Sequence, residues 1–286
     1  MINSVLIRII VVFSFLWCVI SGLQAGYQPE FSTAGFFSLP NTGRQAYSMN
    51  VAWRFFKGDV EGDAFAKSFD DSSWSVVSLP HGIEYLPIES SGCINYQGVV
   101  WYRKHFIPED ALRGKKLFLH FEAIMGKCKI WVNGKLVKEH FGGYLPVIAD
   151  ISDDLKWGED NVIAVWADNS DDITFPPGKS EDTLDFTYMG GIYRDCWLVA
   201  HNDVFITDPN YENIVAGGGL FIYFDRVSPE KAIISLKAHI RNARTKGFRG
   251  TVEYELVQPN GKKLSNVSNP KSFLFSSGTA PVVDSP

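Results

Sequence analysis

Residues 129–138 read KIWVNGKLVK, and this stretch decides the fold class. Ile130, Trp131 and Val132 are β-branched or aromatic residues, which are typical of strands. Asn133-Gly134 follows them, and this pair tolerates positive φ at both central positions of a two-residue turn. Apolar side chains resume after the turn, interspersed with lysines. The stretch therefore predicts a β-hairpin.

Short runs with a period of two dominate the sequence around this hairpin, and Gly, Pro, Asn and Asp separate them. Leu117, Leu119 and Phe121 share one face of such a run, which predicts a half-buried strand. The run 162–167 is nearly all apolar and predicts a strand buried on both faces. Further strands are expected over 100–106 and 196–200. Strands at this spacing, with turn residues between them, indicate a sandwich or jelly roll.

A second unit is expected to begin near Thr207-Asp208-Pro209. Strands are predicted over 220–224, 232–240 and 250–257. Pro259-Asn260-Gly261 predicts a hairpin turn between residues 251–258 and a strand that starts near Lys262. Beyond Ser265 the pattern fades, and the remaining length is below the ~100 residues of an immunoglobulin-like domain. We therefore expect an all-β chain: a jelly-roll β-sandwich over 26–206, then an incomplete immunoglobulin-like β-sandwich over 207–286.

Composition narrows the possible partners. The chain has 286 residues, a formal net charge of −5 and 14% aromatic residues. An acidic chain repels phosphate backbones, which argues against nucleic acid as a partner. The aromatic share fits core packing in an all-β protein, and it also fits carbohydrate recognition by flat rings.

The N-terminal residues have the pattern of a targeting segment. Arg8 precedes an apolar run from Ile9 to Ile20 that is too short to span a bilayer. Leu23-Gln24-Ala25 then provides a small residue for cleavage. Residues 1–25 are therefore expected to be a signal peptide. The mature protein is expected to be periplasmic or secreted, with no membrane contact after cleavage.

Cysteine and acidic residues give no sign of a metal or disulfide framework. Cys93, Cys128 and Cys196 remain after cleavage, and this odd, sparse set argues against paired disulfides. Cys128 and Cys196 fall within predicted strands and are expected to be buried. The acidic clusters 150–154 and 168–172 lack the spacing of a calcium loop and are expected to be solvated turns. We expect neither metal nor cofactor.

Four segments in this order resemble the sugar-binding domain of glycoside hydrolase family 2. They are 69–74 (FDDSSW) with 79–81 (LPH), 100–104 (VWYRK), 121–122 (FE) with 130–134 (IWVNG), and 190–197 (GGIYRDCW). The last segment has Cys196 where the family usually has Val. Together the segments span most of residues 34–204. The second unit resembles the family's immunoglobulin-like module only in position and strand pattern.

The resemblance implies a division of labour. Members of the family usually combine a jelly roll, an immunoglobulin-like sandwich and a (β/α)₈ barrel, and the barrel carries two catalytic Glu residues. A barrel takes about 250 residues, and the family's Asn-Glu motif is not found in this sequence. The resemblance thus implies no catalytic residue in this chain and no activity of the chain alone. It implies the N-terminal portion of an exported, retaining, β-galactosidase-like glycosidase.

Three residues are candidates for sugar binding by this resemblance. In β-galactosidase-type members an Asp lies six residues before the second Gly of GGIYRD and binds galactose, and Asp185 matches it. Asn95 lies in the loop that contributes an Asn in such members. Tyr188 is the candidate for stacking on sugar. The expected partner is a β-galactoside-type oligo- or polysaccharide.

Other notable residues are expected to have structural roles. Arg194 and Asp195 suit hydrogen bonding between strands or domains. Trp101, Trp131 and Trp197 suit packing in the core or against a barrel. The alternatives are a β-glucuronidase or β-mannosidase of the same family, a stand-alone carbohydrate-binding module without catalysis, and a structural sandwich that mediates assembly. The sequence leaves the oligomeric state open.

Overall fold

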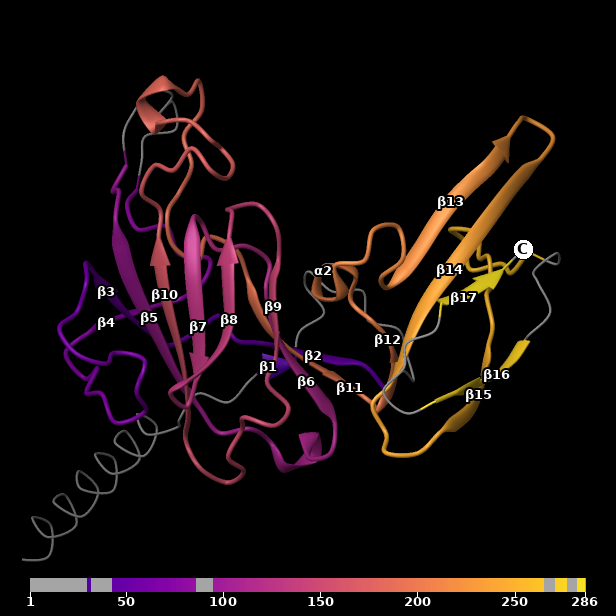
Figure 1. Cartoon of the computed structure of the whole chain (residues 1–286), viewed down its shortest axis with the longest axis horizontal. Helices are drawn as coiled ribbons and strands as arrows, with labels where there is room; N and C mark the ends of the chain where they lie inside the picture. Colours follow the sequence, from indigo (N-terminus) through magenta and orange to yellow (C-terminus); the bar gives the residue numbers. More distant parts are fainter. Residues whose placement is uncertain (1–29, 32–42, 86–94, 265–270, 277–281, 286) are drawn as a thin grey trace, which may run out of the picture.

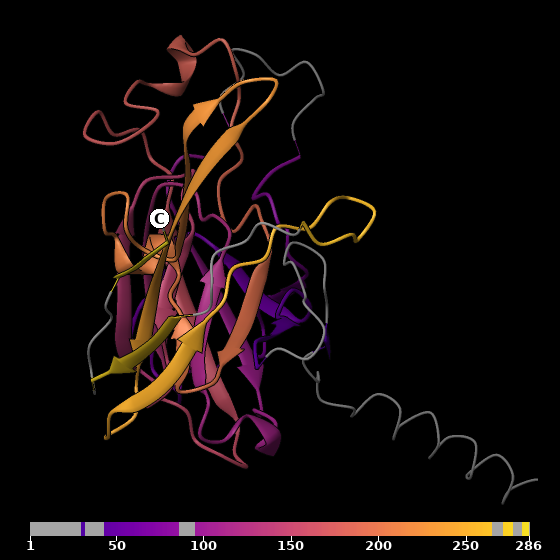
Figure 2. The same cartoon turned by 90° about the vertical axis from the view of Figure 1, so that its right-hand side faces the viewer.

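The computed structural model describes residues 30–31, 43–85, 95–264, 271–276 and 282–285. The chain is almost entirely β, as predicted, and its antiparallel strands form two units side by side (Figures 1 and 2). The first unit is a jelly-roll β-sandwich. Among the described residues, no helix has the length and apolar character needed to cross a bilayer.

Two antiparallel sheets face each other in the sandwich. The five-stranded sheet has the order β1 (Glu30–Phe31), β2 (Gln45–Ser48), β11 (Cys196–His201), β6 (Lys116–Phe121), β9 (Val147–Asp150). The six-stranded sheet has the order β4 (Ser75–Val77), β3 (Trp53–Lys57), β5 (Val99–Phe106), β10 (Asn161–Asp168), β7 (Lys127–Val132), β8 (Lys135–Phe141). Short 3₁₀ turns lie at Asp110–Leu112 (η1) and Glu181–Thr183 (η2).

The predicted hairpin is present as β7 and β8. Asn133 and Gly134 close it with φ of 52° and 87°, as the Asn-Gly turn requires. A register shift between Ile130 and Trp131 places a bulge in the pair. Asn133 also bonds Asn161 through Nδ2 (2.8 Å) and accepts from the Val162 backbone N–H (3.1 Å). The turn is thereby fastened to the start of β10.

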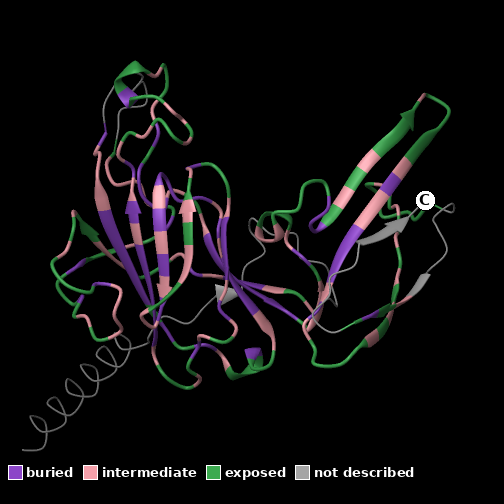
Figure 3. Cartoon of the chain, viewed as in Figure 1, coloured by how far each residue is buried: buried purple, intermediate pink, exposed green. Residues whose placement is uncertain are grey.

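The core lies between the two sheets and is built from almost fully buried hydrophobic residues. Figure 3 shows these buried positions along the strands of both sheets. Strand β10 is buried on both faces, as predicted. Aromatic rings cover its outer face. Trp101 and Trp131 stack with ring centroids 5.6 Å apart, and Phe65 stacks on Trp131 at 5.4 Å. Cys128 and Cys196 are buried free thiols, as expected, whereas Cys93 and the predicted signal peptide lie outside the described residues.

The second unit is smaller and more exposed (Figure 3). Strand β14 (Ala232–Asn242) pairs with β13 (Leu220–Val227), β12 (Val204–Ile206) and β17 (Val282–Ser285). A second pair joins β15 (Phe248–Val252) to β16 (Lys271–Phe275). Among its described residues, the buried hydrophobic cluster consists of Ala238, Ile240 and Phe275.

One strand prediction in this unit is wrong in extent. The strand expected over 250–257 ends at Val252, because β15 finds its partner in β16 rather than across the Pro259-Asn260-Gly261 turn. The turn itself forms, with Gly261 at a φ of 82° and its N–H donating to Gln258 O at 2.8 Å. Only an isolated bridge between Val257 and Lys263 flanks it.

An aromatic cluster joins the two units. Phe118 of β6 meets Phe205 of β12 and Tyr211 of the short helix α2 (Pro209–Glu212), with ring centroids 5.9 and 5.1 Å apart. His201 of β11 stacks on Phe205 at 4.8 Å. The outer face of the five-stranded sheet is thus partly covered by the beginning of the second unit.

Candidate functional site

The candidate site lies on the long connection between β10 and β11, at the end of the sandwich drawn uppermost in Figure 1. This connection returns to the sheet through Gly190-Gly191. Gly191 has a φ of +88°, and a Cβ at this position would lie 2.3 Å from Oη of Tyr102. The close approach explains why the returning chain needs glycine here.

Residues 182–187 form an arch between two buried ends, Glu181 and Tyr188. Glu181 is 1% exposed and Tyr188 is 7% exposed, whereas the residues between them are exposed or half-buried. Asp185, the predicted galactose ligand, is on the exposed part of this arch.

Asn95 connects the two ends of the arch. Its Nδ2 donates to Glu181 Oε1 at 2.8 Å and to the carbonyl oxygen of Tyr188. Its backbone N–H donates to Glu181 Oε2 at 3.1 Å. Asn169 Nδ2 donates to Asn95 Oδ1 at 3.1 Å, which fixes the orientation of the amide.

Two further residues make the same double connection. Gln97 Nε2 donates to Glu181 Oε2 at 2.8 Å and to Tyr188 Oη at 3.3 Å. Asp171 Oδ1 accepts from the Glu181 backbone N–H at 3.1 Å and from Tyr188 Oη at 3.3 Å. Burial raises the pKa of Glu181, the bonds from Asn95 and Gln97 oppose this shift, and the Asp171 carboxylate adds to it.

Asp185 lines an open hollow of about 690 Å³. This volume is within the range of small-molecule sites. Tyr144, from the β8–β9 loop, and Phe186 line the same hollow, and both rings are close to half exposed. The remaining lining residues are Pro177, Lys179, Thr183 and Leu184. A carboxylate, a cation and two accessible aromatic rings are therefore gathered at one place.

A neighbouring hollow of about 580 Å³ shares Tyr144 and is lined by Arg194 and Asp195, among others. Arg194 donates through Nε and Nη2 to Glu122 Oε2, both at 3.0 Å. Asp195 Oδ1 accepts from Asn50 Nδ2 at 2.7 Å. The predicted structural roles of Arg194 and Asp195 are confirmed, since each links the residues just before β11 to another segment of the sandwich.

The other two predicted sugar ligands are inside the loop rather than on its surface. Both amide hydrogens of Asn95 are used within the protein, and the residue is 7% exposed. Tyr188 is equally buried and its hydroxyl bonds Gln97 and Asp171, which leaves little ring face for the predicted stacking. In this structure Asn95 and Tyr188 hold the arch, and Asp185 alone of the three faces the hollow.

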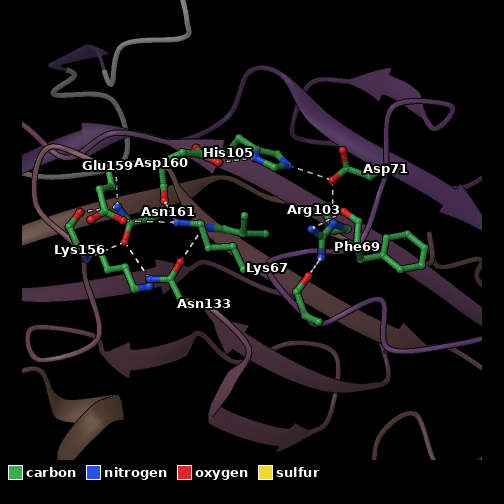
Figure 4. A network of polar contacts seen from close by, with 12 residues as sticks. Lys67, Phe69, Asp71, Arg103, His105, Asn133, Lys156, Glu159, Asp160 and Asn161 are labelled. Atoms are coloured by element: carbon green, nitrogen blue, oxygen red, sulfur yellow. Dashed lines mark hydrogen bonds and ion pairs between the residues drawn. The ribbon is translucent and has the colours of Figure 1, made fainter.

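The first two motif segments build a polar network away from this hollow (Figure 4). The fully buried Arg103 donates through Nε to Asp71 Oδ2 at 2.6 Å, and its Nη atoms bond the carbonyl oxygens of Ala64, Ala66 and Phe69. His105 lies between Asp71 and Asp160. This network clamps the 64–71 segment over the tryptophans of the six-stranded sheet, so these motifs serve the fold.

Sequence reasoning missed Tyr144, Phe186 and Glu181. Tyr144 follows Gly142-Gly143 in a loop, and Phe186 is next to Asp185, so an exposed aromatic in a glycine-rich turn was an available signal. No local signal marks Glu181, because its partners Asn95 and Gln97 are more than 80 residues away in the sequence.

The side chains that line the hollow are of kinds that bind polar ligands. A carboxylate accepts hydrogen bonds from sugar hydroxyls, and charged acceptors form stronger bonds than neutral ones. Accessible aromatic rings offer apolar faces. Within the described part of the chain, no group of three or more His, Cys, Asp or Glu side chains is arranged to hold a metal ion.

Known proteins resemble this chain in both sequence and structure. Residues 64–202 match the family model described as "Glycosyl hydrolases family 2, sugar binding domain". A beta-galactosidase of Thermoanaerobacter pseudethanolicus is 34% identical over 236 residues, which is 82% of this chain and 28% of the relative. A beta-glucuronidase of Formosa agariphila is 29% identical over 241 residues, covering 80% of this chain and 24% of the relative.

Solved structures agree with these relatives. A Bacteroides uniformis beta-glucuronidase superposes with a TM-score of 0.74 at 28% identity, covering 85% of this chain and 27% of that chain. A putative beta-galactosidase from Bacteroides fragilis superposes with a TM-score of 0.72 at 29% identity, covering 85% and 35%. The chain thus spans only about a quarter to a third of the length of these proteins.

Proposed function

This chain belongs to glycoside hydrolase family 2 through its sugar-binding domain, and we propose that this domain forms one wall of a pocket for a β-galactoside. The observation that carries the proposal is the position of Asp185, on an exposed arch in the same hollow as Tyr144 and Phe186. The Asp185 carboxylate would accept hydrogen bonds from two sugar hydroxyls, and the rings would face the apolar side of the sugar.

A β-glucuronide is the second candidate ligand. Lys179 lines the same hollow and supplies a cation for a uronate carboxylate. Relatives with the names beta-galactosidase and beta-glucuronidase both match the chain. Asp185 favours the neutral sugar, because a uronate would bring a like charge toward it.

For the whole protein we propose an exported, retaining glycosidase that acts in carbohydrate breakdown. In a retaining mechanism two carboxyl groups about 5–5.5 Å apart act as nucleophile and acid/base. We place these groups outside this chain, so the chain alone should not cleave glycosides, and as one wall of the pocket it should bind sugar only weakly. Export is supported by the apolar run behind Arg8. Mass spectrometry of the secreted protein tests it: the mature chain should begin at Gly26, and an intact Met1 would contradict export.

The sugar-binding proposal is tested by titrating the purified chain with methyl β-galactoside and methyl β-glucuronide, followed by NMR of the backbone amides 182–187. Asp185→Asn should weaken galactoside binding by about ten- to a hundredfold, because a hydrogen bond to a charged group is lost. Asp182→Asn removes the same charge from an exposed neighbour and should have no effect. Equal affinities for wild type and Asp185→Asn would refute the role of Asp185, and hydrolysis of a chromogenic galactoside by the chain alone would refute the division of labour.

A further inference from the structure

The arch that carries Asp185 is held at both ends by the same three side chains. Asn95, Gln97 and Asp171 each bond to Glu181 and also to Tyr188. Glu181 is the charged residue of the two ends, and its two carboxylate oxygens accept three hydrogen bonds from Asn95 and Gln97. A bond to a charged group contributes more than a neutral one, and a buried donor that loses its acceptor incurs a desolvation cost. The distance between the two ends of the arch is therefore fixed.

Resting on the proposed sugar role of Asp185, we propose that Glu181 and Asn95 are positioning residues, which hold the 182–187 arch in its binding conformation before the sugar arrives. Neither residue needs to touch the sugar for this role, since both are buried beneath the arch. Asn95, which sequence resemblance offered as a sugar ligand, would then act on the sugar only through Asp185.

Pre-ordering of this kind affects affinity directly. An exposed loop that must be ordered on binding loses conformational entropy at that moment, and a loop that is already ordered does not. Asp185 is separated by three residues from Glu181 on one side and by two from Tyr188 on the other. Loosening either end would therefore spread Asp185 over several positions and weaken sugar binding without changing any atom that touches the sugar.

The hydrogen bonds between Glu181 and Asn95 can be tested by exchanging the carboxylate and the amide between the two positions. Glu181 Oε2 accepts from the Asn95 backbone N–H and from Gln97, whereas Oε1 accepts from Asn95 Nδ2. Glu181→Gln can keep the first two bonds, but its amide N–H₂ then faces the Asn95 N–H₂. Asn95→Asp brings a second carboxylate against Glu181. The double variant, with both changes, restores a donor–acceptor pair between the two side chains and keeps the net charge of wild type. It does not restore the bond from residue 95 to the Tyr188 carbonyl oxygen, because a carboxylate has no donor.

Three quantities are measured for wild type, the two single variants, the double variant and Asp182→Asn. They are the hydrogen exchange of the 182–187 amides, the melting temperature and the affinity for methyl β-galactoside. Each single variant should speed exchange across the arch by about tenfold or more, because local opening no longer breaks the full set of bonds. The double variant should exchange more slowly than Asn95→Asp, because the two carboxylates no longer face each other, but it should remain faster than wild type, because the bond to the Tyr188 carbonyl oxygen is missing. Affinity should follow exchange, while the melting temperature should move by no more than about 2 °C, since the sandwich core is untouched.

The outcomes separate the two proposals. The positioning role would be overturned if the arch amides of Glu181→Gln exchanged no faster than those of Asp182→Asn. It would also be overturned if the arch amides of the double variant exchanged as fast as those of Asn95→Asp. Faster exchange with unchanged sugar affinity would also overturn it, because the bonds would then serve the fold alone. If wild type binds no galactoside, the proposed function is wrong, and the exchange rates still decide whether Glu181 and Asn95 hold the arch.

Discussion

His105 Nδ1 lies 2.7 Å from Oδ2 of Asp160, while the opposite ring nitrogen, Nε2, lies 3.0 Å from Oδ2 of Asp71. Ionised carboxylates only accept hydrogen bonds, and a neutral imidazole has one N–H. Both contacts are therefore hydrogen bonds only when His105 is protonated. The imidazolium then joins the segment before β4 to the loop before β10, beside the Arg103–Asp71 pair (Figure 4).

This arrangement predicts a loss of stability at alkaline pH. The bond to Asp71, followed by that to Asp160, raises the pKa of His105 in the folded state. A raised folded-state pKa gives stability that is complete below the unfolded value of about 6.5 and is lost as pH rises through the folded value. His105 is partly exposed, so we expect a change of about 1 kcal/mol or less. Urea unfolding at pH 6 and pH 9 should show that the stability advantage of wild type over His105→Gln is smaller at pH 9, a comparison in which other titrating groups cancel.

His201 predicts that the stability of the fold also decreases as the pH falls below neutral. Burial lowers its pKa to about 4, so its contribution is complete above about pH 6.5 and is lost as pH falls toward 4. Protonation would place a charge among Phe118, Phe205 and Tyr211, at the junction of the two units. His201→Phe should flatten the decline in stability between pH 6.5 and 4, which reaches about 3 kcal/mol at most. If His201→Phe lost as much stability as wild type between pH 6.5 and 4, His201 would not be the group responsible.

Arg103 predicts a large effect on folding that is unrelated to sugar. It is fully buried, and its guanidinium bonds Asp71 and three backbone carbonyl oxygens. Arg103→Ala would leave the Asp71 carboxylate without this partner in a mostly buried site, which costs about 3–5 kcal/mol. Arg103→Lys should also be destabilising, because an ammonium cannot reproduce the planar fork. Urea unfolding of both variants at pH 7 measures this, and a loss below about 1 kcal/mol in Arg103→Ala would refute the clamp.

The sequence made the sandwich predictable because its signals are local. The Asn133-Gly134 turn and the apolar run 162–167 each specify their own backbone, and both are found as β7–β8 and β10. The strand expected over 250–257 was overestimated for the complementary reason. Its alternation continues past Val252, but its length is set by β16, a partner that no local pattern identifies.

The candidate site, too, could be predicted from the sequence only in part. Asp185 could be selected because a neighbouring motif, Gly190-Gly191, fixed its offset. The residues that hold it could not, because Asn95 and Glu181 are 86 residues apart and meet only after the sandwich has folded. Exposure also required the structure: Asp185 and Tyr188 are both polar loop residues in the sequence, yet one is exposed and the other is 7% exposed.

Tyr144 provides the last prediction, which separates ring contact from hydrogen bonding in the Asp185 hollow. Its ring is 49% exposed and lines this hollow together with Phe186. If the ring packs against the apolar face of a sugar, Tyr144→Ala should weaken binding of methyl β-galactoside by about three- to tenfold, the scale of a single aromatic contact. Tyr144→Phe keeps the ring and should bind as wild type does. Calorimetric titration of the three proteins measures this, with the melting temperature as a check on folding. Equal losses in both variants would assign the contribution to the hydroxyl, and no loss in Tyr144→Ala would remove Tyr144 from the sugar site.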